Sequence, residues 1–363
     1  MSIQQDLIEW QVQDVRCHRG GRMLVPAEQA PFGRTLPYRR FAGERPNSGC
    51  AEIVRSRGWI ADLGQRGLGD LLLGLSAVTA LREVSGDVPL HYSGPEAQLL
   101  RRCAVPLASA EHTTGPHVVR TGTRSPVRFR IDPQEHPTWL DRLGSGQVEV
   151  HAALPMRQYL AVEQSLGQRL SAETAPAPGF RSARAAQPWH VVFVAVPGRL
   201  RHLEFQLSGF AAVARELVGM VAAPWRFTVI TARNTAGADD FDGLPADVLR
   251  EPDAAECVDL FASAELVVGT DSGRTRLAAL TERADGHGPQ VVGLYSRHAH
   301  TKWTTGRAGH HAIATRFAQL LALADRSAEP AELTDETWGA QADLRPVSPA
   351  LVAEFAARCA GWC

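Results

Sequence analysis

The chain has 363 residues, of which 44% are hydrophobic and 21% are charged. This composition is that of a globular protein, so it excludes a largely disordered chain, and the length predicts two domains or one large one. The 38 basic and 39 acidic side chains give a net charge of -1, which argues against a protein that coats nucleic acid or an anionic membrane. No apolar run approaches the roughly 18–20 residues of a transmembrane segment, and the N-terminal segment is acidic where a secretion signal is basic. We therefore expect a soluble, cytoplasmic protein.

The six cysteines form no recognisable metal-binding or disulfide pattern. No two of them have the C-x-x-C spacing, so we expect reduced thiols and no bound metal. Cys359 and Cys363 lie one helical turn apart and could pair or share a metal, although an incidental placement is the simpler interpretation. His298 and His300 would need a third metal ligand, and the sequence offers no clear one.

The first half of the chain predicts one α/β domain. Residues 1–57 have little periodicity and contain a loop rich in Pro, Gly and Arg, so we treat them as an N-terminal extension. A domain over 58–175 then opens with a short apolar strand at 58–64, a glycine-rich turn and a helix with apolar positions from 71 to 82. Further strands are expected at 88–92, 118–119, 127–131 and 148–151, and further helices at 96–103 and 156–170. A loop rich in Ala, Pro and Ser follows, and residues 176–188 are the predicted linker.

The second half predicts another α/β domain over residues 189–345. Apolar strands are expected at 189–196, 226–231, 266–269 and 290–295, alternating with helices at 207–221, 254–264 and 276–282. Nearly continuous apolar strands that alternate with helices are typical of a parallel sheet covered on both faces. Residues 346–363 form a C-terminal helix that could pack back on the first domain. The two domains would face each other across a cleft, where ligands usually bind.

Two glycine-containing turns between a strand and a helix are candidate anion sites. In the turn at residues 67–70, glycines would let backbone N–H groups approach a ligand, and Asp70 would follow them; alternatively, Asp70 only caps or charges the helix. In the second turn, Asp271, Ser272 and Gly273 follow a buried strand, and the start of the next helix could hold a diphosphate; ordinary helix capping is the alternative.

Two basic segments follow strands of the second half. Arg199 and Arg201 come after the strand at 189–196 and could neutralise a phosphate, or they could belong to a solvated loop. The segment from Tyr295 to Trp303 combines His, Lys and Trp side chains after the last predicted strand.

Taken together and in chain order, these segments resemble the bacterial heptosyltransferases, glycosyltransferase family 9. The resemblance covers about residues 58 to 320 and depends on four features: the Gly69-Asp70 turn ahead of an apolar helix, a helix ending in Leu166-Gly167, a strand ending in Pro197-Gly198, and the Asp271-Ser272-Gly273 segment followed by a strand and a loop that contains Trp303.

This resemblance implies the α/β fold called GT-B, with two Rossmann-like domains facing each other across a cleft. It implies an inverting, metal-independent transfer of a sugar from a nucleoside diphosphate, ADP-heptose in the best-known members, with no other cofactor. Asp70 would be the general base, and Arg199 or Arg201 would neutralise the leaving group. Besides Arg199, the expected donor-binding residues are Arg250, Glu251, Pro252, Asp271, Ser272, Gly273, Arg274 and Arg276. The expected acceptor-binding residues are Gly69, Tyr295 and His298.

The sequence departs from the family pattern at Arg276, where the family has His, and at 295–298, where it has a turn resembling Gly-Pro-Thr. Because the chain is neutral and has no obvious membrane-binding helix, we expect a small soluble acceptor such as a nucleoside or an aminocyclitol in antibiotic biosynthesis. The alternatives are a lipopolysaccharide-type heptosyltransferase, a GT-B sugar-nucleotide epimerase and a non-catalytic GT-B binding protein. The sequence leaves the oligomeric state open.

Overall fold

The structure is a computed structural model. It describes residues 7–11, 22–26, 37–40, 59–62, 67–86, 90–93, 96–111, 127–130, 148–151, 154–155, 158–159, 177–196, 205–235, 237–298, 300–323, 328 and 330–363.

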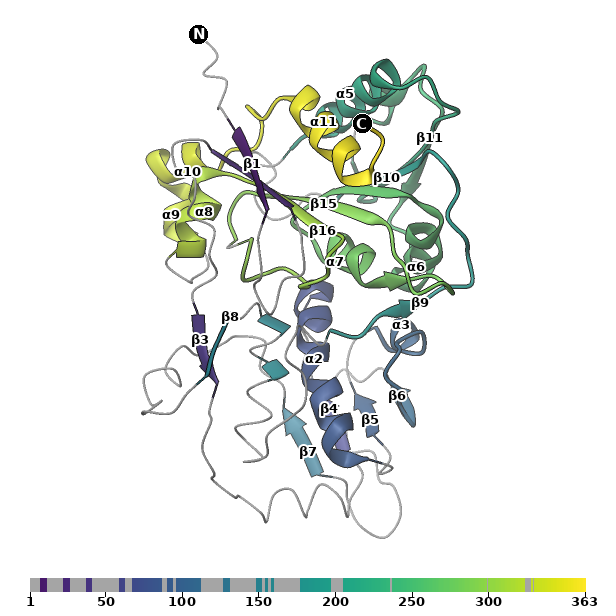
Figure 1. The fold of residues 1–363 in the computed structure, drawn as a ribbon, viewed down its shortest axis with the longest axis vertical. Coiled ribbons are helices and arrows are strands. Elements are labelled where there is room, and N and C mark those ends of the chain that lie inside the picture. Colours follow the sequence, from purple (N-terminus) through teal and green to yellow (C-terminus); the bar gives the residue numbers. More distant parts are fainter. Residues whose placement is uncertain are drawn as a thin grey trace.

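A sheet of eight strands dominates the second half of the chain (Figure 1). Six of its strands run parallel in the order β12-β11-β10-β13-β15-β16. They are β10 (His190–Ala195), β11 (Arg226–Thr231), β12 (Ala246–Arg250), β13 (Leu266–Thr270), β15 (Gln290–Tyr295) and β16 (His310–Ala314). Of these six strands, β10 is the first in the sequence and lies in the middle of the sheet. The next two, β11 and β12, follow on one side of it, and β13 then lies on its other side. The strand order therefore reverses between β10 and β13, which is the switch point of a Rossmann-like sheet.

Two N-terminal strands extend this sheet. β1 (Leu7–Gln11) pairs antiparallel with β2 (Arg22–Pro26), and β2 pairs parallel with β16. The expected separate extension over 1–57 is therefore corrected, because residues 7–11 and 22–26 belong to the sheet of the second domain. β3 (Pro37–Arg40) instead pairs with β8 (Val148–His151) in a ribbon of two strands.

Helices cover both faces of the large sheet, because alternate side chains of its strands point to opposite faces. Val191 and Phe193 pack on one face with α5 (Leu207–Met220) and α11 (Pro349–Ala360), whereas Val192 and Val194 pack on the other with α6 (Ala254–Ser263) and α7 (Gly273–Leu280). The C-terminal helix α11 lies beside α5 (Figure 1), so the expectation that it packs back on the first domain is wrong. The described residues of this half also form the short helices α8 (Arg316–Leu323), α9 (Pro330–Thr334) and α10 (Glu336–Ala342) and the 3-10 turn η4 (Ala238–Phe241).

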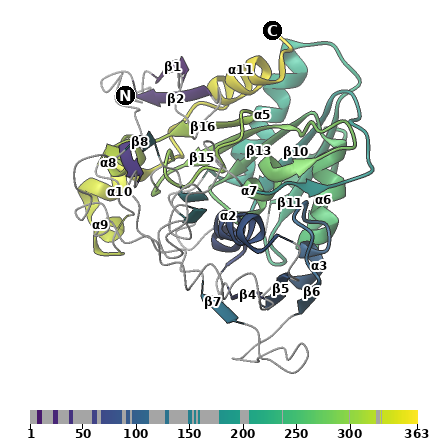
Figure 2. The same ribbon diagram turned by 60° about the horizontal axis from the view of Figure 1, so that its bottom comes forward.

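The first half contains a smaller parallel sheet in the order β6-β5-β4-β7. Its strands are β4 (Trp59–Asp62), β5 (Leu90–Ser93), β6 (Ser109–Glu111) and β7 (Val127–Arg130). The helix α2 (Leu68–Ser85) follows β4, as the sequence predicts, and α3 (Ala97–Leu100) follows β5. Figure 2 shows α2 between the two sheets, next to α7.

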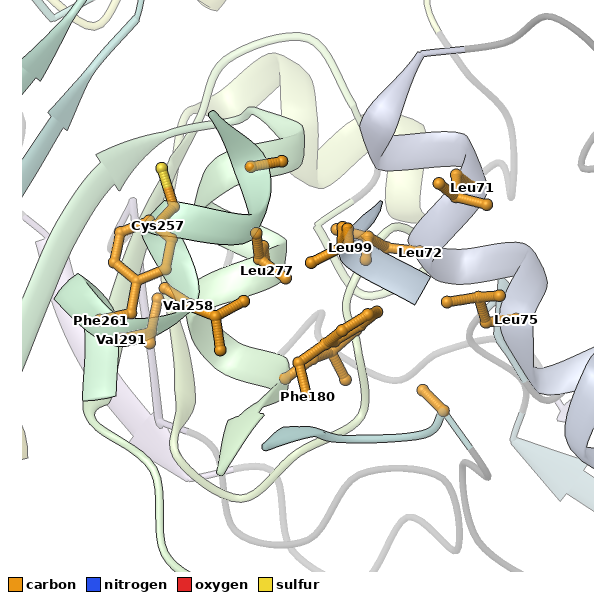
Figure 3. Close-up of a cluster of buried hydrophobic side chains, with 14 of the residues drawn as sticks. Leu71, Leu72, Leu75, Leu99, Phe180, Cys257, Val258, Phe261, Leu277 and Val291 are labelled. Atoms are coloured by element: carbon orange, nitrogen blue, oxygen red, sulfur yellow. The ribbon is translucent and has the colours of Figure 1, made fainter. Parts of the chain in front are cut away.

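One apolar cluster joins the two sheets (Figure 3). Leu71, Leu72 and Leu75 of α2 are at most 1% exposed, and they share the cluster with Leu277 of α7. Phe180 fills the same cluster from β9 (Phe180–Arg181), a short strand that pairs with β14 (Thr281–Glu282). Of the predicted linker over 176–188, residues 177–180 and 182 are therefore buried between the domains, whereas 181 and 183–188 are exposed. Burial of a single Leu or Phe side chain contributes about 1.5–3 kcal/mol, so this cluster fixes how α2 lies against α7.

The strongly apolar strands and the helices between them lie where the sequence predicts them. The helix predicted at 276–282 instead begins at Gly273, and β12 lies where the sequence predicts no strand. The strand expected at 118–119 and nearly all of the helix expected at 156–170 fall outside the described residues. Within the described ranges, none of the helices has the length and hydrophobicity needed to cross a bilayer.

Candidate active site at the junction of two helix N-termini

The candidate site lies at the switch point of the large sheet, where β10 and β13 end. The Thr270 hydroxyl at the end of β13 donates a hydrogen bond of 3.0 Å to the Val196 carbonyl, which follows β10. This bond ties the two strand ends together. Ligands of open α/β sheets usually bind outside the carboxyl ends of the strands at such a point.

The helix α7 starts directly at this point, and its first two backbone amides bond to none of the described residues. Ser272 is its N-cap, and the Ser272 hydroxyl accepts a hydrogen bond of 3.3 Å from the Thr275 amide. The Thr275 hydroxyl donates a bond of 2.6 Å to the Thr270 carbonyl and anchors the turn to β13. The first amides of a helix have no partner within the helix, so those of Gly273 and Arg274 are available to an anion. Ser272 thus acts as a helix cap, and the two preceding amides remain a candidate anion site.

The start of α2 touches the start of α7. A Cβ atom added to Gly273 would lie 2.6 Å from the Gly69 amide nitrogen and 2.8 Å from the Leu68 Cβ. A Cβ atom added to Gly69 would lie 2.8 Å from Nη1 of Arg276. Side chains larger than hydrogen do not fit at either glycine without movement, so the two glycines permit the contact. The structure therefore brings the two predicted turns together, with one turn from each domain.

Asp70 stands in the first turn of α2, and its side chain pairs with none of the described residues. The N-cap of α2 is Gly67, no side chain caps the helix, and the half-buried Asp70 carboxylate makes no hydrogen bond or ion pair with the residues that the structure describes. The alternative that Asp70 is a hydrogen-bonding cap is therefore excluded, although its charge still interacts favourably with the helix dipole. An unpaired carboxylate beside the junction is suited to accept a proton.

Asp271 joins two cationic or ionisable side chains next to the start of α7. One oxygen of its carboxylate accepts a hydrogen bond from Nη2 of Arg276, and the other pairs with Nδ1 of His298. The side chains of Asp271 and Arg276 are only 5% and 6% exposed. Burial alone would raise the pKa of Asp271, but the neighbouring His298 and Arg276 hold this pKa well below its usual range. Asp271 is therefore ionised, and both of its oxygens are engaged.

Trp303 packs against both side chains that pair with Asp271. Nε of Arg276 donates a hydrogen bond of 3.0 Å to the Trp303 carbonyl, and the Arg276 guanidinium lies 5.7 Å from the centre of the Trp303 ring. The His298 ring packs on the same indole, with ring centres 5.0 Å apart. The sequence shows Trp303 as part of a family-like loop, but its contacts with both side chains depend on the fold.

The predicted donor residues 250–252 lie at the end of β12, which β11 separates from β10. Nη1 of Arg250 donates to two loop carbonyls, and Glu251 has a positive φ of 48° and pairs with Arg233 at 3.2 Å. Nη2 of Arg274 donates a hydrogen bond of 2.9 Å to the Pro252 carbonyl. Arg274 therefore braces the 250–252 bend against the start of α7.

The remaining predicted residues divide into two groups. Arg199 and Arg201 fall outside the described residues. Tyr295 is 2% exposed, its hydroxyl bonds to Nε2 of His310 at 3.1 Å, and burial raises the pKa of its hydroxyl. This position in the core gives a ligand no access to Tyr295, so it does not favour the expected acceptor role.

A cavity of about 510 Å³ lies elsewhere, between α3 and β6. Its lining includes Leu100, Cys103 and Leu107 and none of the predicted site residues. Among the described residues, no group of three or more His, Cys, Asp or Glu side chains is placed to hold a metal ion.

The sequence matches no protein-family model and no curated protein. Solved structures do resemble the fold. The iron-containing dodecameric glycosyltransferase TibC from enterotoxigenic E. coli H10407 aligns with a TM-score of 0.55 and 13% identity over 85% of this chain and 80% of that chain. A family 9 glycosyl transferase from Veillonella parvula DSM 2008 aligns with a TM-score of 0.53 and 10% identity, over 85% of this chain and 98% of that chain. E. coli heptosyltransferase WaaC with ADP aligns with a TM-score of 0.50 and 13% identity, over 83% of this chain and 99% of that chain. The chain thus has the fold of the family 9 glycosyltransferases, the two-domain GT-B architecture that the sequence predicts.

Proposed function

We propose that the chain is an inverting, metal-independent glycosyltransferase that uses a nucleoside diphosphate sugar, with ADP-heptose as the first candidate. The acceptor in this proposal is a small soluble molecule, such as a nucleoside or an aminocyclitol in antibiotic biosynthesis. The proposal depends on one observation: the start of α2 meets the start of α7. Within the described part of the chain, the Asp70 carboxylate and the first two amides of α7 have no partners.

In the proposed reaction, Asp70 is the general base. Its carboxylate takes the proton of the acceptor hydroxyl or amine while that atom forms a bond to the anomeric carbon of the donor sugar. The bond between this carbon and the diphosphate oxygen breaks on the opposite side, so the configuration inverts. Its electron pair leaves with the nucleoside diphosphate.

The negative charge of the diphosphate falls where the chain concentrates positive groups. The amides of Gly273 and Arg274 face the anion at the start of α7. Arg276 has one guanidinium nitrogen, Nη1, that makes no hydrogen bond within the described part of the chain and lies beside Gly69. Arg199 and Arg201 would complete this set. With these groups in place, charge stabilisation of the leaving group does not require a metal ion.

Solved structures with this fold support the choice of donor. One of the similar structures is a heptosyltransferase described with ADP, and TibC is also described in complex with ADP-D-β-D-heptose, in a structure that aligns with a TM-score of 0.53. The acceptor is inferred from the net charge of -1 and from a sequence with no obvious amphipathic helix of the kind that binds a membrane surface.

The test is nucleotide release from ADP-heptose and from UDP-, GDP- and dTDP-sugars, with and without candidate acceptors and with and without EDTA. Release of ADP that requires an acceptor and is unchanged by EDTA is the expected result. Release of UDP without an acceptor would identify an epimerase. If none of these nucleotides raised the melting temperature, the chain would be a non-catalytic protein of the same fold.

A further inference from the structure

We propose that His298 is the residue that hydrogen-bonds the leaving diphosphate, and that Asp271 positions its imidazole for this contact. This inference rests on the proposed function and gives His298 a different role from the acceptor contact expected from the sequence.

The position of the imidazole is fixed from one side only. Nδ1 of His298 donates to the Asp271 carboxylate, and the ring packs on Trp303. Nε2, on the other side of the ring, makes no hydrogen bond with any described residue, and the side chain is 27% exposed. A carboxylate that holds one ring nitrogen sets the orientation of the ring and directs the second nitrogen outward.

The network does not need His298 merely to neutralise Asp271. Asp271 is already paired with Arg276. The Arg276 side chain is only 6% exposed, and it also donates a hydrogen bond to the Trp303 carbonyl. With one oxygen bonded to Arg276 and the other to His298, Asp271 is poorly placed to bind the donor itself. Of the polar side-chain atoms of Asp271 and His298, Nε2 of His298 is therefore the one available to the donor.

The diphosphate is the part of the donor that this atom can reach. Asp271 directly precedes Ser272 and Gly273, so the imidazole is attached beside the first amides of α7. A second, independent feature points to an anion at the same place. The buried Arg276 side chain directs Nη1, which has no hydrogen-bond partner among the described residues, to the junction of Gly69 and Gly273.

In the transfer step, the acceptor atom bonds to the anomeric carbon, and its proton goes to Asp70. The bond from that carbon to the diphosphate oxygen breaks, and the electron pair stays on this oxygen. Because Nδ1 already donates to Asp271, Nε2 of His298 is a donor only in the doubly protonated imidazolium. In that form its N–H donates a hydrogen bond to the same oxygen, and the imidazolium stabilises the charge that develops there.

The experiment measures the binding of inorganic pyrophosphate, ADP and AMP to the full-length protein by calorimetry. His298→Ala should weaken pyrophosphate and ADP about tenfold or more, because a charge-assisted hydrogen bond is lost, and should leave AMP nearly unchanged. His298→Gln, which keeps an N–H donor, should recover part of the loss. His287→Gln is the control, because His287 lies in an exposed turn away from the site. Equal affinities of wild type and His298→Ala for pyrophosphate would overturn the inference and leave the proposed function standing.

The role of Asp271 is tested by a double-mutant cycle. If Asp271 acts through His298, Asp271→Asn should weaken pyrophosphate binding in the wild-type background but add little to the loss in the His298→Ala background. Fully additive losses would overturn the positioning role. If the unmodified protein bound neither pyrophosphate nor any nucleoside diphosphate, the proposed function would fall, and this inference with it.

Discussion

Replacing Gly273 by Ala tests whether the two helix starts touch as the structure has them. The new Cβ atom would lie 2.6 Å from the Gly69 nitrogen, whereas ordinary contacts begin at 3.4 Å, so the helices would have to separate by about 0.8 Å. The atoms that would be pushed are backbone atoms and the Leu68 Cβ, which cannot swing aside as the end of a side chain can. Overpacking of this kind costs about 1–3 kcal/mol.

The same substitution at Gly219 is the matched control. Gly219 also lies in a helix, α5, and a Cβ atom there would meet nothing within 4 Å. Gly219→Ala should therefore stabilise the protein by up to about 1 kcal/mol. Urea denaturation gives the free energies of unfolding of both variants. Equal stabilities of Gly273→Ala and Gly219→Ala would refute the close approach of α2 and α7.

Gly273→Ala should also impair function more than stability alone explains. A displacement near 1 Å of groups that must act together can lower turnover about 10²-fold. Nucleotide release should fall in Gly273→Ala at a temperature where the protein remains folded, but not in Gly219→Ala. Undiminished turnover in a folded Gly273→Ala protein would mean that the reaction does not use the junction.

Three further predictions test the site, a buried histidine and the apolar cluster. Asp70→Asn should lower turnover about 10²–10⁴-fold and change the free energy of unfolding by less than about 1 kcal/mol. The control is Glu336→Gln, which also removes a carboxylate from the first turn of a helix, α10, and should leave turnover unchanged. Burial lowers the pKa of His311 to about 4 from 6.5, and Nδ1 of His311 accepts a hydrogen bond of 2.9 Å from the Arg22 amide. The stability contributed by neutral His311 is thus complete above about pH 6.5, and about 3 kcal/mol of it is lost as the pH falls to 4. Measured by urea denaturation, the free energy of unfolding should depend less on pH in His311→Gln than in the wild type. Parallel pH dependences of the two proteins would contradict this. Leu277 of α7 is fully buried in the apolar cluster that α7 shares with α2, and Leu277→Ala should lower the free energy of unfolding by about 2–5 kcal/mol. A loss below about 1 kcal/mol would show that the cluster does not join the domains.

The strands that the sequence predicts correctly are those whose own residues identify them. β10, β13 and β15 are continuous apolar runs because helices cover both of their faces, so composition alone marks them. β12 has mostly exposed or half-buried residues at the edge of the sheet, and its polar sequence resembles a loop. The place of β2 beside β16 could not be predicted either, because it depends on a pairing between the two ends of the chain.

The site was predictable in its parts but not in its assembly. The two glycine turns, at Gly69 and Gly273, are visible as local patterns, and the family resemblance predicts that they face the same ligand. That the two glycines touch follows from the packing of α2 on α7 through the apolar cluster, which no local pattern shows. The pairing of His298 with Asp271 likewise depends on the loop after β15 folding back to the end of β13. Tyr295 shows the reverse case: a residue of suitable chemistry in a suitable segment is held in the core.

The contact between α2 and α7 has an electrostatic consequence that favours an anion. Each helix start carries roughly half a positive charge, and bringing two such ends together costs on the order of 1 kcal/mol at an effective dielectric constant near 20. The apolar cluster of Leu71, Leu72 and Leu277 offsets this repulsion many times over, so the packing of the two helices holds their positive ends in contact. Asp70 compensates the charge of α2, whereas Asp271 is already paired with Arg276 and His298 and compensates little of the charge of α7. The junction therefore retains a positive potential on the α7 side and a proton acceptor on the α2 side, which is the polarity needed to hold a leaving diphosphate while an acceptor is deprotonated.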